Sequence, residues 1–273
     1  MSRRRWCFTV GGVIFMSSDS NRDGIFMATQ FTGFSQAGLT FLQQVRQYND
    51  KAWFDEHRAL YDEQLVAPFR TLVDELSLTM LQIDDHFETR PAIGKTLSRI
   101  HRDTRFSHDK SRYRSHMWLT FKRTRKDWTD APVYFFEITP DTWRYGLGYY
   151  SATRNTMDLF RQTLRGNSPQ FLEVASCLGN TFTLEGESYK RPLIKDQEPE
   201  LANWYNRKSF AAICTRQDME ALFSGDLVAV LSQGFTQLEP LYHYLMNIET
   251  MKKAAQEAEL DTRAFSADKW FER

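Results

Sequence analysis

Cysteine is scarce in this sequence, and no two cysteines stand close together. Cys7, Cys177 and Cys214 are far apart, odd in number and outside any CxxC pattern. This distribution argues against a disulfide framework and against a structural zinc site. We therefore expect a protein of the reducing cytoplasm.

The chain also lacks a net charge, since its 35 basic residues balance its 35 acidic ones. A neutral molecule has no overall electrostatic attraction to a polyanion or to an anionic bilayer. Neither a nucleic acid nor a membrane is expected as a partner, and any basic surface must be local.

No long hydrophobic run is present, although "RRRWCFTVGGVIFM" at the N-terminus imitates a secretory signal. Its apolar part spans only about ten residues, too few to cross a bilayer, and no small-x-small cleavage pattern follows. We expect residues 1–26 to be a disordered extension or upstream read-through, residues 27–250 to form one domain, and residues 251–273 a polar helical tail. The translation start is left open between Met1, Met16 and Met27.

Several catalytic motifs are missing, among them HExxH, GxSxG and GxGxxG. "GKT" at 94–96 resembles the end of a phosphate loop, but Thr89 stands where that loop needs a glycine. Ser107 and Lys110 fit the pattern SxxK without a plausible KTG or SDN partner. No nucleophile and no cofactor can be assigned, and whether the protein is an enzyme stays open.

Apolar residues are plentiful, at 41% of the chain, and their spacing predicts helices at both ends. Helical periodicity covers 39–48 and then 51–81, where Pro68 predicts a break or kink. It returns in 153–179 and again from Asp218 to about Leu260, with a break at Pro240.

Strand-like alternation fills the middle of the chain. It covers 116–121, 133–138 and 142–150, and shorter candidates lie at 181–187 and 209–216. Helices on either side of a run of antiparallel strands predict a single α+β domain with a sheet of about four to six strands.

Basic residues are concentrated in one segment, from Lys95 to Lys126. It contains eleven basic residues against Asp103 and Asp109, a local charge of +9. Arginine offers planar paired donors that match phosphate or carboxylate oxygens, so an anion site is one interpretation. The other is a structural network in which these arginines pair with carboxylates. Glu137 is one such carboxylate, because it interrupts an apolar strand and needs a partner if it is buried. An arginine of this segment is the obvious candidate for that partner.

A metal site in the same segment is not expected. His101, His108 and His116 match no recognised ligand spacing, and the surrounding guanidinium groups disfavour a divalent cation.

The segment "SRIHRDTRFSHDKSRYRSHM" resembles the Arg-Ile-x-Arg-Asp-Thr-Arg-Phe-Ser-x-Asp-Lys-x-x-Tyr signature of the bacterial and fungal family called domain of unknown function 2461. "FTGFSQAGLTFLQQVRQYNDKAWFDEHRALYDEQLVAP", "YKRP" and "LEPLYHYL" are similar to its other landmarks, so the resemblance covers roughly residues 31–248.

The resemblance implies one compact α+β domain but no activity, because none is assigned to the family. Tyr48 and the segment "LIKDQEP" after Pro192 depart from the usual pattern, which weakens any ligand role of that loop. The characteristic residues present here are Asn49, Trp53, Phe54, Arg99, Arg102, Asp103, Thr104, Arg105, Phe106, Ser107, Asp109, Lys110, Tyr113, Lys190 and Arg191.

The functional hypothesis is a site for an anionic small molecule. Its acid–base candidates are Asp103, Asp109 and His116. The expected ligand-binding residues are Arg99, Arg102, Arg105, Lys110 and Arg191, with Tyr113 and Trp53 as aromatic walls. The alternative is a non-catalytic binding or interaction domain in which the Arg–Asp motif holds the fold.

Overall fold

A computed structural model describes residues 30–105, 108–124, 130–149 and 152–271 of the chain, with side chains as far as residue 258. The predicted N-terminal extension, 1–26, lies outside the described residues. The described helices are α1 (Gln36–Tyr48), α2 (Lys51–Tyr61), α3 (Ala67–Ile83), α4 (Arg154–Gly166), α5 (Ser168–Ala175), α6 (Pro199–Tyr205), α7 (Asp226–Gln237) and α8 (Glu239–Phe271). The strands are β1 (Met117–Phe121), β2 (Val133–Ile138), β3 (Trp143–Gly148), β4 (Thr183–Glu185) and β5 (Ala211–Arg216).

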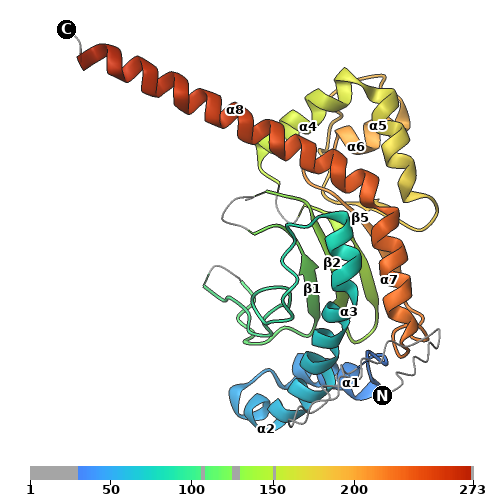
Figure 1. Cartoon of the computed structure of the whole chain (residues 1–273). Coiled ribbons are helices and arrows are strands. Elements are labelled where there is room, and N and C mark those ends of the chain that lie inside the picture. The colour runs from blue at the N-terminus through green and yellow to red at the C-terminus, as the bar shows by residue number, and fades with distance from the viewer. Residues whose placement is uncertain (1–29, 106–107, 125–129, 150–151, 272–273) are drawn as a thin grey trace, which may run out of the picture.

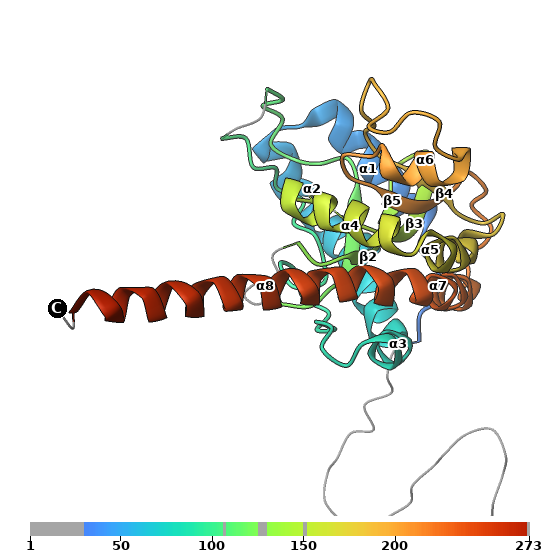
Figure 2. The same cartoon turned by 90° about the horizontal axis from the view of Figure 1, so that it is seen from above.

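These elements form the predicted α+β domain. The strands make one antiparallel sheet in the order β1-β2-β3-β5-β4. Helices α3 and α7 lie on the same side of this sheet, whereas α1 and α2 lie below it and α4 to α6 near its upper end (Figures 1 and 2). No described helix combines the length and the apolar composition needed to cross a membrane.

The two faces of the sheet differ in burial. One face carries Leu119, Phe136, Tyr145, Leu147 and further apolar side chains that are buried beneath α3 and α7. Gly234 of α7 permits a close approach here, because a Cβ at this position would lie 2.4 Å from the Tyr145 ring. We call the opposite side of the sheet the open face. The half-buried Trp118 of β1 lies on it, because side chains alternate along a strand.

Capping residues and a proline determine where the N-terminal helices begin. Ser35 caps α1 by accepting a hydrogen bond from the Gly38 N–H at 3.1 Å, and Asp50 caps α2 through the Trp53 N–H. Asn49, the residue between α1 and Asp50, binds the backbone of Tyr113. Pro68 occupies the first turn of α3, directly after a π-helical segment at Asp62–Val66.

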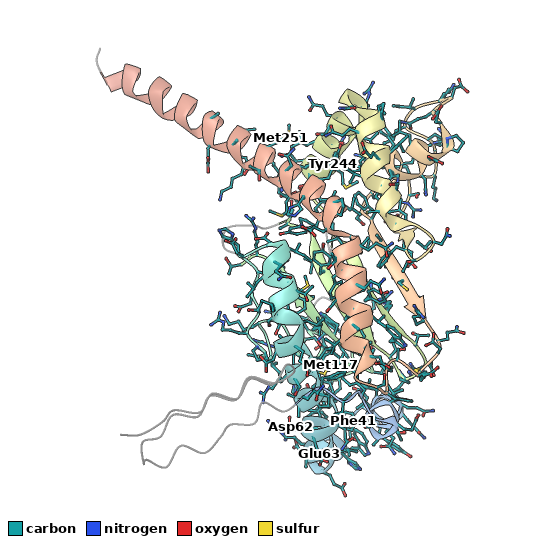
Figure 3. All side chains as sticks on the ribbon, turned by 45° about the vertical axis from the view of Figure 1, so that its right-hand side comes forward. Phe41, Asp62, Glu63, Met117, Tyr244 and Met251 are labelled. Carbon is teal, nitrogen blue, oxygen red and sulfur yellow. The ribbon has the colours of Figure 1, made fainter. Side chains whose placement is uncertain are left out.

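The C-terminal helix α8 leaves the body of the molecule (Figure 1). Tyr244 packs on Phe171 of α5, with ring centroids 5.1 Å apart. Met251, seven residues further on, is 43% exposed and lies where the helix moves away from the sheet (Figure 3).

Candidate functional site

The Arg-rich motif continues the sheet beyond β1 as an irregular hairpin. Leu97 forms a bridge with Leu119, and the Ser98 N–H donates to the Trp118 carbonyl at 2.9 Å. Further along, the Arg102 N–H donates to the Arg112 carbonyl and the Arg114 N–H to that of Ile100, each at 2.8 Å. The motif therefore lies at an edge of the sheet, against β1.

Asn49 attaches this hairpin to the helical layer. Its Nδ2 donates to the Tyr113 carbonyl at 2.8 Å, and its Oδ1 accepts from the Tyr113 N–H at 2.9 Å. The Tyr113 ring stacks on Phe54 with centroids 4.4 Å apart and is 4% exposed. Tyr113, predicted as an aromatic wall, thus packs in the core.

Several basic side chains of the motif are engaged within it. Arg105 binds Asp103 through two hydrogen bonds, of 3.0 and 2.8 Å, and Arg102 Nη1 lies 3.0 Å from Asp109 Oδ2. Lys110 Nζ donates to the Thr104 carbonyl at 2.8 Å. This is the arrangement expected of the structural interpretation.

These contacts determine the protonation of the two aspartates. The Arg105 side chain and N–H lower the pKa of Asp103 to about 2. Hydrogen bonds from Ser111 and the charge of Arg102 lower the pKa of Asp109. Both carboxylates carry no proton at neutral pH, so of the three acid–base candidates His116 alone stays suited to proton transfer there.

A second group of charged residues faces the open side of the sheet. Strand alternation places Arg114, His116 and Trp118 on one side of their chain segment. Register places Trp118 opposite Glu137 of β2, and Glu137 opposite Arg144 of β3. Candidate site residues from successive strands are therefore neighbours.

Glu137 occupies the centre of this group and is 9% exposed. The Arg144 Nε donates to its Oε2 at 2.5 Å, and His116 Nε2 lies 3.8 Å from its Oε1. Its partner is thus Arg144, and the prediction that an arginine of the motif would pair with Glu137 is wrong. The two Nη groups of Arg144 make no hydrogen bond with any residue that the structure describes.

Two arginines of the motif approach the same place. The Arg114 guanidinium lies over the Trp118 ring, 5.2 Å from its centroid, and donates to the carbonyls of Arg99 and His101. Arg102 Nε is buried and has no hydrogen-bond partner within the described part of the chain. An unsatisfied buried donor of this kind needs a physical explanation.

Burial lowers the pKa of His116. The carboxylate of Glu137 opposes this effect, whereas the charges of Arg114, Arg102 and Arg144 lower the pKa further. His116 is therefore neutral at pH 7 and surrounded by cations. Its ring stacks on Trp118 with centroids 5.4 Å apart.

The remaining predicted residues lie apart from this group. Trp53 stacks on His57 at 4.3 Å and on Tyr48 at 5.9 Å in the helical layer. The Arg99 guanidinium is exposed beside Gly94, where a Cβ would lie 3.2 Å from its Nη2. Arg191 lies in the exposed connection between β4 and α6.

Sequence reasoning missed Arg144 and treated Glu137 only as a partner for the motif. The signal was present, because each is the one charged residue of its strand and each stands two residues outside the turn at 139–142. Only the strand register shows that they are direct neighbours.

Two cavities are also found, of about 390 and 310 Å³. The larger is lined by residues that include Asp84, His86, Arg123 and Tyr242, and the smaller lies between α4 and α8 around Lys252. Neither of these two cavities is lined by a residue of the 97–116 hairpin.

Asp84, Asp85 and His86 lie close enough together to offer ligand atoms to a cation. Asp84 is already engaged, however, because its Oδ2 accepts from Arg123 Nε at 2.7 Å and from the Tyr242 hydroxyl. A guanidinium on the same carboxylate disfavours a divalent ion, and we assign no metal here.

A family model described as "Conserved hypothetical protein (DUF2461)" matches residues 37–244. No curated protein matches the chain. The matched region contains the hairpin, the whole sheet and its open face.

Proposed function

Because the chain belongs to the DUF2461 family, whose description names no activity, we propose a function from the geometry: the protein binds a small phosphate- or carboxylate-bearing anion on the open face of its sheet, beside His116. The Arg–Asp pairs of the hairpin hold the fold, and the neighbouring group around His116 binds the ligand.

One observation carries the proposal. Arg144 and His116 both contact the carboxylate of Glu137, and Arg114 lies over the Trp118 ring on which His116 stacks. The charges of these two arginines and of Arg102 lower the pKa of His116. The local charge is then three minus one, or +2. The Nη groups of Arg144 retain donors that an anion can satisfy, and the buried Nε of Arg102 has no hydrogen-bond partner among the described residues.

A catalytic version of this proposal assigns proton transfer to His116. A neutral imidazole can accept a proton from a bound substrate, and the carboxylate of Glu137 at 3.8 Å would stabilise the imidazolium that forms. We expect such a reaction in the cytoplasm, where the free thiols of Cys177 and Cys214 stay reduced.

Titration calorimetry of the full chain with inorganic phosphate and with acetate tests the proposal. Replacing a charged hydrogen-bond donor typically costs about 1.5–3 kcal/mol, so Arg144→Gln should weaken phosphate binding at least about tenfold. The matched control is Arg191→Gln, which should bind as the wild type does. A wild-type protein that gives no binding heat with either anion contradicts the proposal.

Arg144→Gln also removes the partner of a buried carboxylate, so its folding needs a separate check. The double variant Glu137→Gln/Arg144→Gln removes both charges together and should keep a near-native melting temperature. Retained phosphate affinity in this double variant would place the anion elsewhere.

The second candidate, a non-catalytic domain with a purely structural motif, is favoured by the Arg102–Asp109 and Arg105–Asp103 pairs. Arg102→Lys separates the two. In the structural case it lowers the melting temperature equally with and without phosphate. In the anion-binding case it abolishes the stabilisation that phosphate gives.

A further inference from the structure

The open face carries apolar residues that do not belong to the main core. Trp118, Val133 and Phe135 are half-buried. None of these three residues belongs to the core cluster of the described chain or packs against it. Aromatic surface therefore lies on the same face as the charged group around His116.

Phe135 is the central residue of this apolar surface. It pairs with Thr120 of β1 on one side and with Gly146 of β3 on the other. Gly146 is required by the close approach of β5, since a Cβ there would lie 2.0 Å from the Ala212 carbonyl oxygen. The position beside Phe135 thus has no side chain to cover the ring.

The Phe135 ring also has no aromatic partner among the described residues, unlike the neighbouring Phe136, which contacts Phe34, Phe69 and Trp143. Its partly exposed ring, with no aromatic partner among the described residues, offers surface to a planar group.

Phe135 is two residues from Glu137 on the same face of β2, a separation of about 6.6 Å along a strand. Arg144 is the cross-strand partner of Glu137. A ring lying on Phe135 and an anionic group held by Arg144 can therefore belong to one small molecule.

We propose that the ligand of the open face is a small anion whose charged group is attached to an aromatic ring. The ring lies on Phe135, between Thr120 and Gly146, and the anionic group binds Arg144 beside His116. This inference rests on the proposed anion site and adds the class of ligand.

The charge pattern favours a small ligand over a polymer. The cations around His116 form one compact group beside a buried carboxylate, and the strand position beyond Phe135 carries the apolar Val133. A nucleic-acid strand would need basic residues along its whole path.

Three probes test the inference by titration calorimetry: inorganic phosphate, cyclohexyl phosphate and phenyl phosphate. Stacking between aromatic rings is worth about 0.5–1.5 kcal/mol, so phenyl phosphate should bind about two- to tenfold tighter than cyclohexyl phosphate. Phe135→Leu should abolish this preference and leave the affinity for inorganic phosphate within about twofold. Phe135→Tyr retains the ring and should retain the preference.

Tyr48→Leu is the matched control, since Tyr48 is an exposed aromatic residue stacked on Trp53 in the helical layer. It should keep the preference for phenyl phosphate. Equal binding of phenyl and cyclohexyl phosphate by the wild type, or a preference that survives in Phe135→Leu, would overturn the inference while inorganic phosphate binding still supports the anion site. Failure of all three probes overturns both.

An oligothymidylate provides a fourth arm. Tighter binding of the oligomer than of phenyl phosphate, with a steep loss of affinity at higher salt, would replace the small ligand by a nucleic acid.

Discussion

Asp84 is a single residue at which distant parts of the chain meet. It follows the last residue of α3, and its carboxylate accepts hydrogen bonds from Arg123, just after β1, and from Tyr242 of α8. Its side chain is 3% exposed. Burial alone would raise the pKa of Asp84, but the bonds from Arg123, Tyr242 and the His86 N–H outweigh it and lower the pKa below its usual value.

We expect Asp84→Asn to destabilise the protein by about 3 kcal/mol, because it removes the negative charge from the buried end of the ion pair with Arg123 and weakens the hydrogen bond from Tyr242. Urea denaturation at pH 7 measures this. Asp85→Asn, at an 83% exposed side chain, is the control and should change the free energy of unfolding by less than about 0.5 kcal/mol. Equal effects of the two substitutions would contradict the assigned role of Asp84.

The Asp84–Arg123 ion pair also makes the stability of the protein depend on pH. A carboxyl with a depressed folded-state pKa contributes stability above its unfolded pKa of about 3.9, and the contribution is lost as the pH falls through the folded value. The stability difference between wild type and Asp84→Asn should therefore be constant above about pH 5 and shrink toward pH 2.

At the scale of elements, the hairpin of the Arg-rich motif depends on α1 through Asn49. Asn49→Ala removes both hydrogen bonds to the Tyr113 backbone and leaves a buried N–H and carbonyl unsatisfied. Each such group costs about 1–3 kcal/mol, so we expect a loss of at least about 2 kcal/mol. Hydrogen exchange at the Tyr113 amide should accelerate as well.

Thr40→Ala is the control for this element, since its hydroxyl bonds only the Gln36 carbonyl on the exposed side of α1. It should leave Tyr113 exchange unchanged. Slow Tyr113 exchange in Asn49→Ala would show that Phe54 stacking alone holds the hairpin.

The long helices and the main strands were predictable because their apolar periodicity is strong. The sequence did not predict α6, whose seven residues are too short for a helical period and lie in a charged stretch. Nor did it predict that residues 97–102 pair beside β1, because their alternation is hidden by charged side chains. His116, expected as the first residue of a strand, directly precedes β1.

For the molecule as a whole, the candidate site depends on register, which the sequence specified only in part. The tight turn between 133–138 and 142–150 implied that β2 and β3 pair, yet the exact partners Glu137 and Arg144 required the observed register. The pairing of β3 with β5 joins segments some 63 positions apart and had no local signal. The sequence showed that basic residues are concentrated in the motif. It did not show which arginines pair within the hairpin and which lie near His116.

One lysine in the middle of α8 joins this helix to α4 and Asp130 through polar contacts. Lys252 Nζ donates to Thr156 of α4 at 2.8 Å and contacts the carboxylates of Asp130 and Glu249 at 3.1 and 2.5 Å. Burial raises the pKa of Glu249, an effect that the charge and hydrogen bond of Lys252 oppose. Both carboxylates are nearly fully buried, so they need this ammonium group.

Lys252→Met should therefore lower the free energy of unfolding by about 3 kcal/mol, whereas Lys195→Met, at an exposed position, should change it by less than about 0.5 kcal/mol. Adding Glu249→Gln removes one of the two uncompensated charges, so the double variant should recover part of the loss, as measured by urea denaturation. If Glu249→Gln and Lys252→Met instead add independently, the two side chains are not energetically coupled, and apolar contacts such as Tyr244 on Phe171 must hold α8.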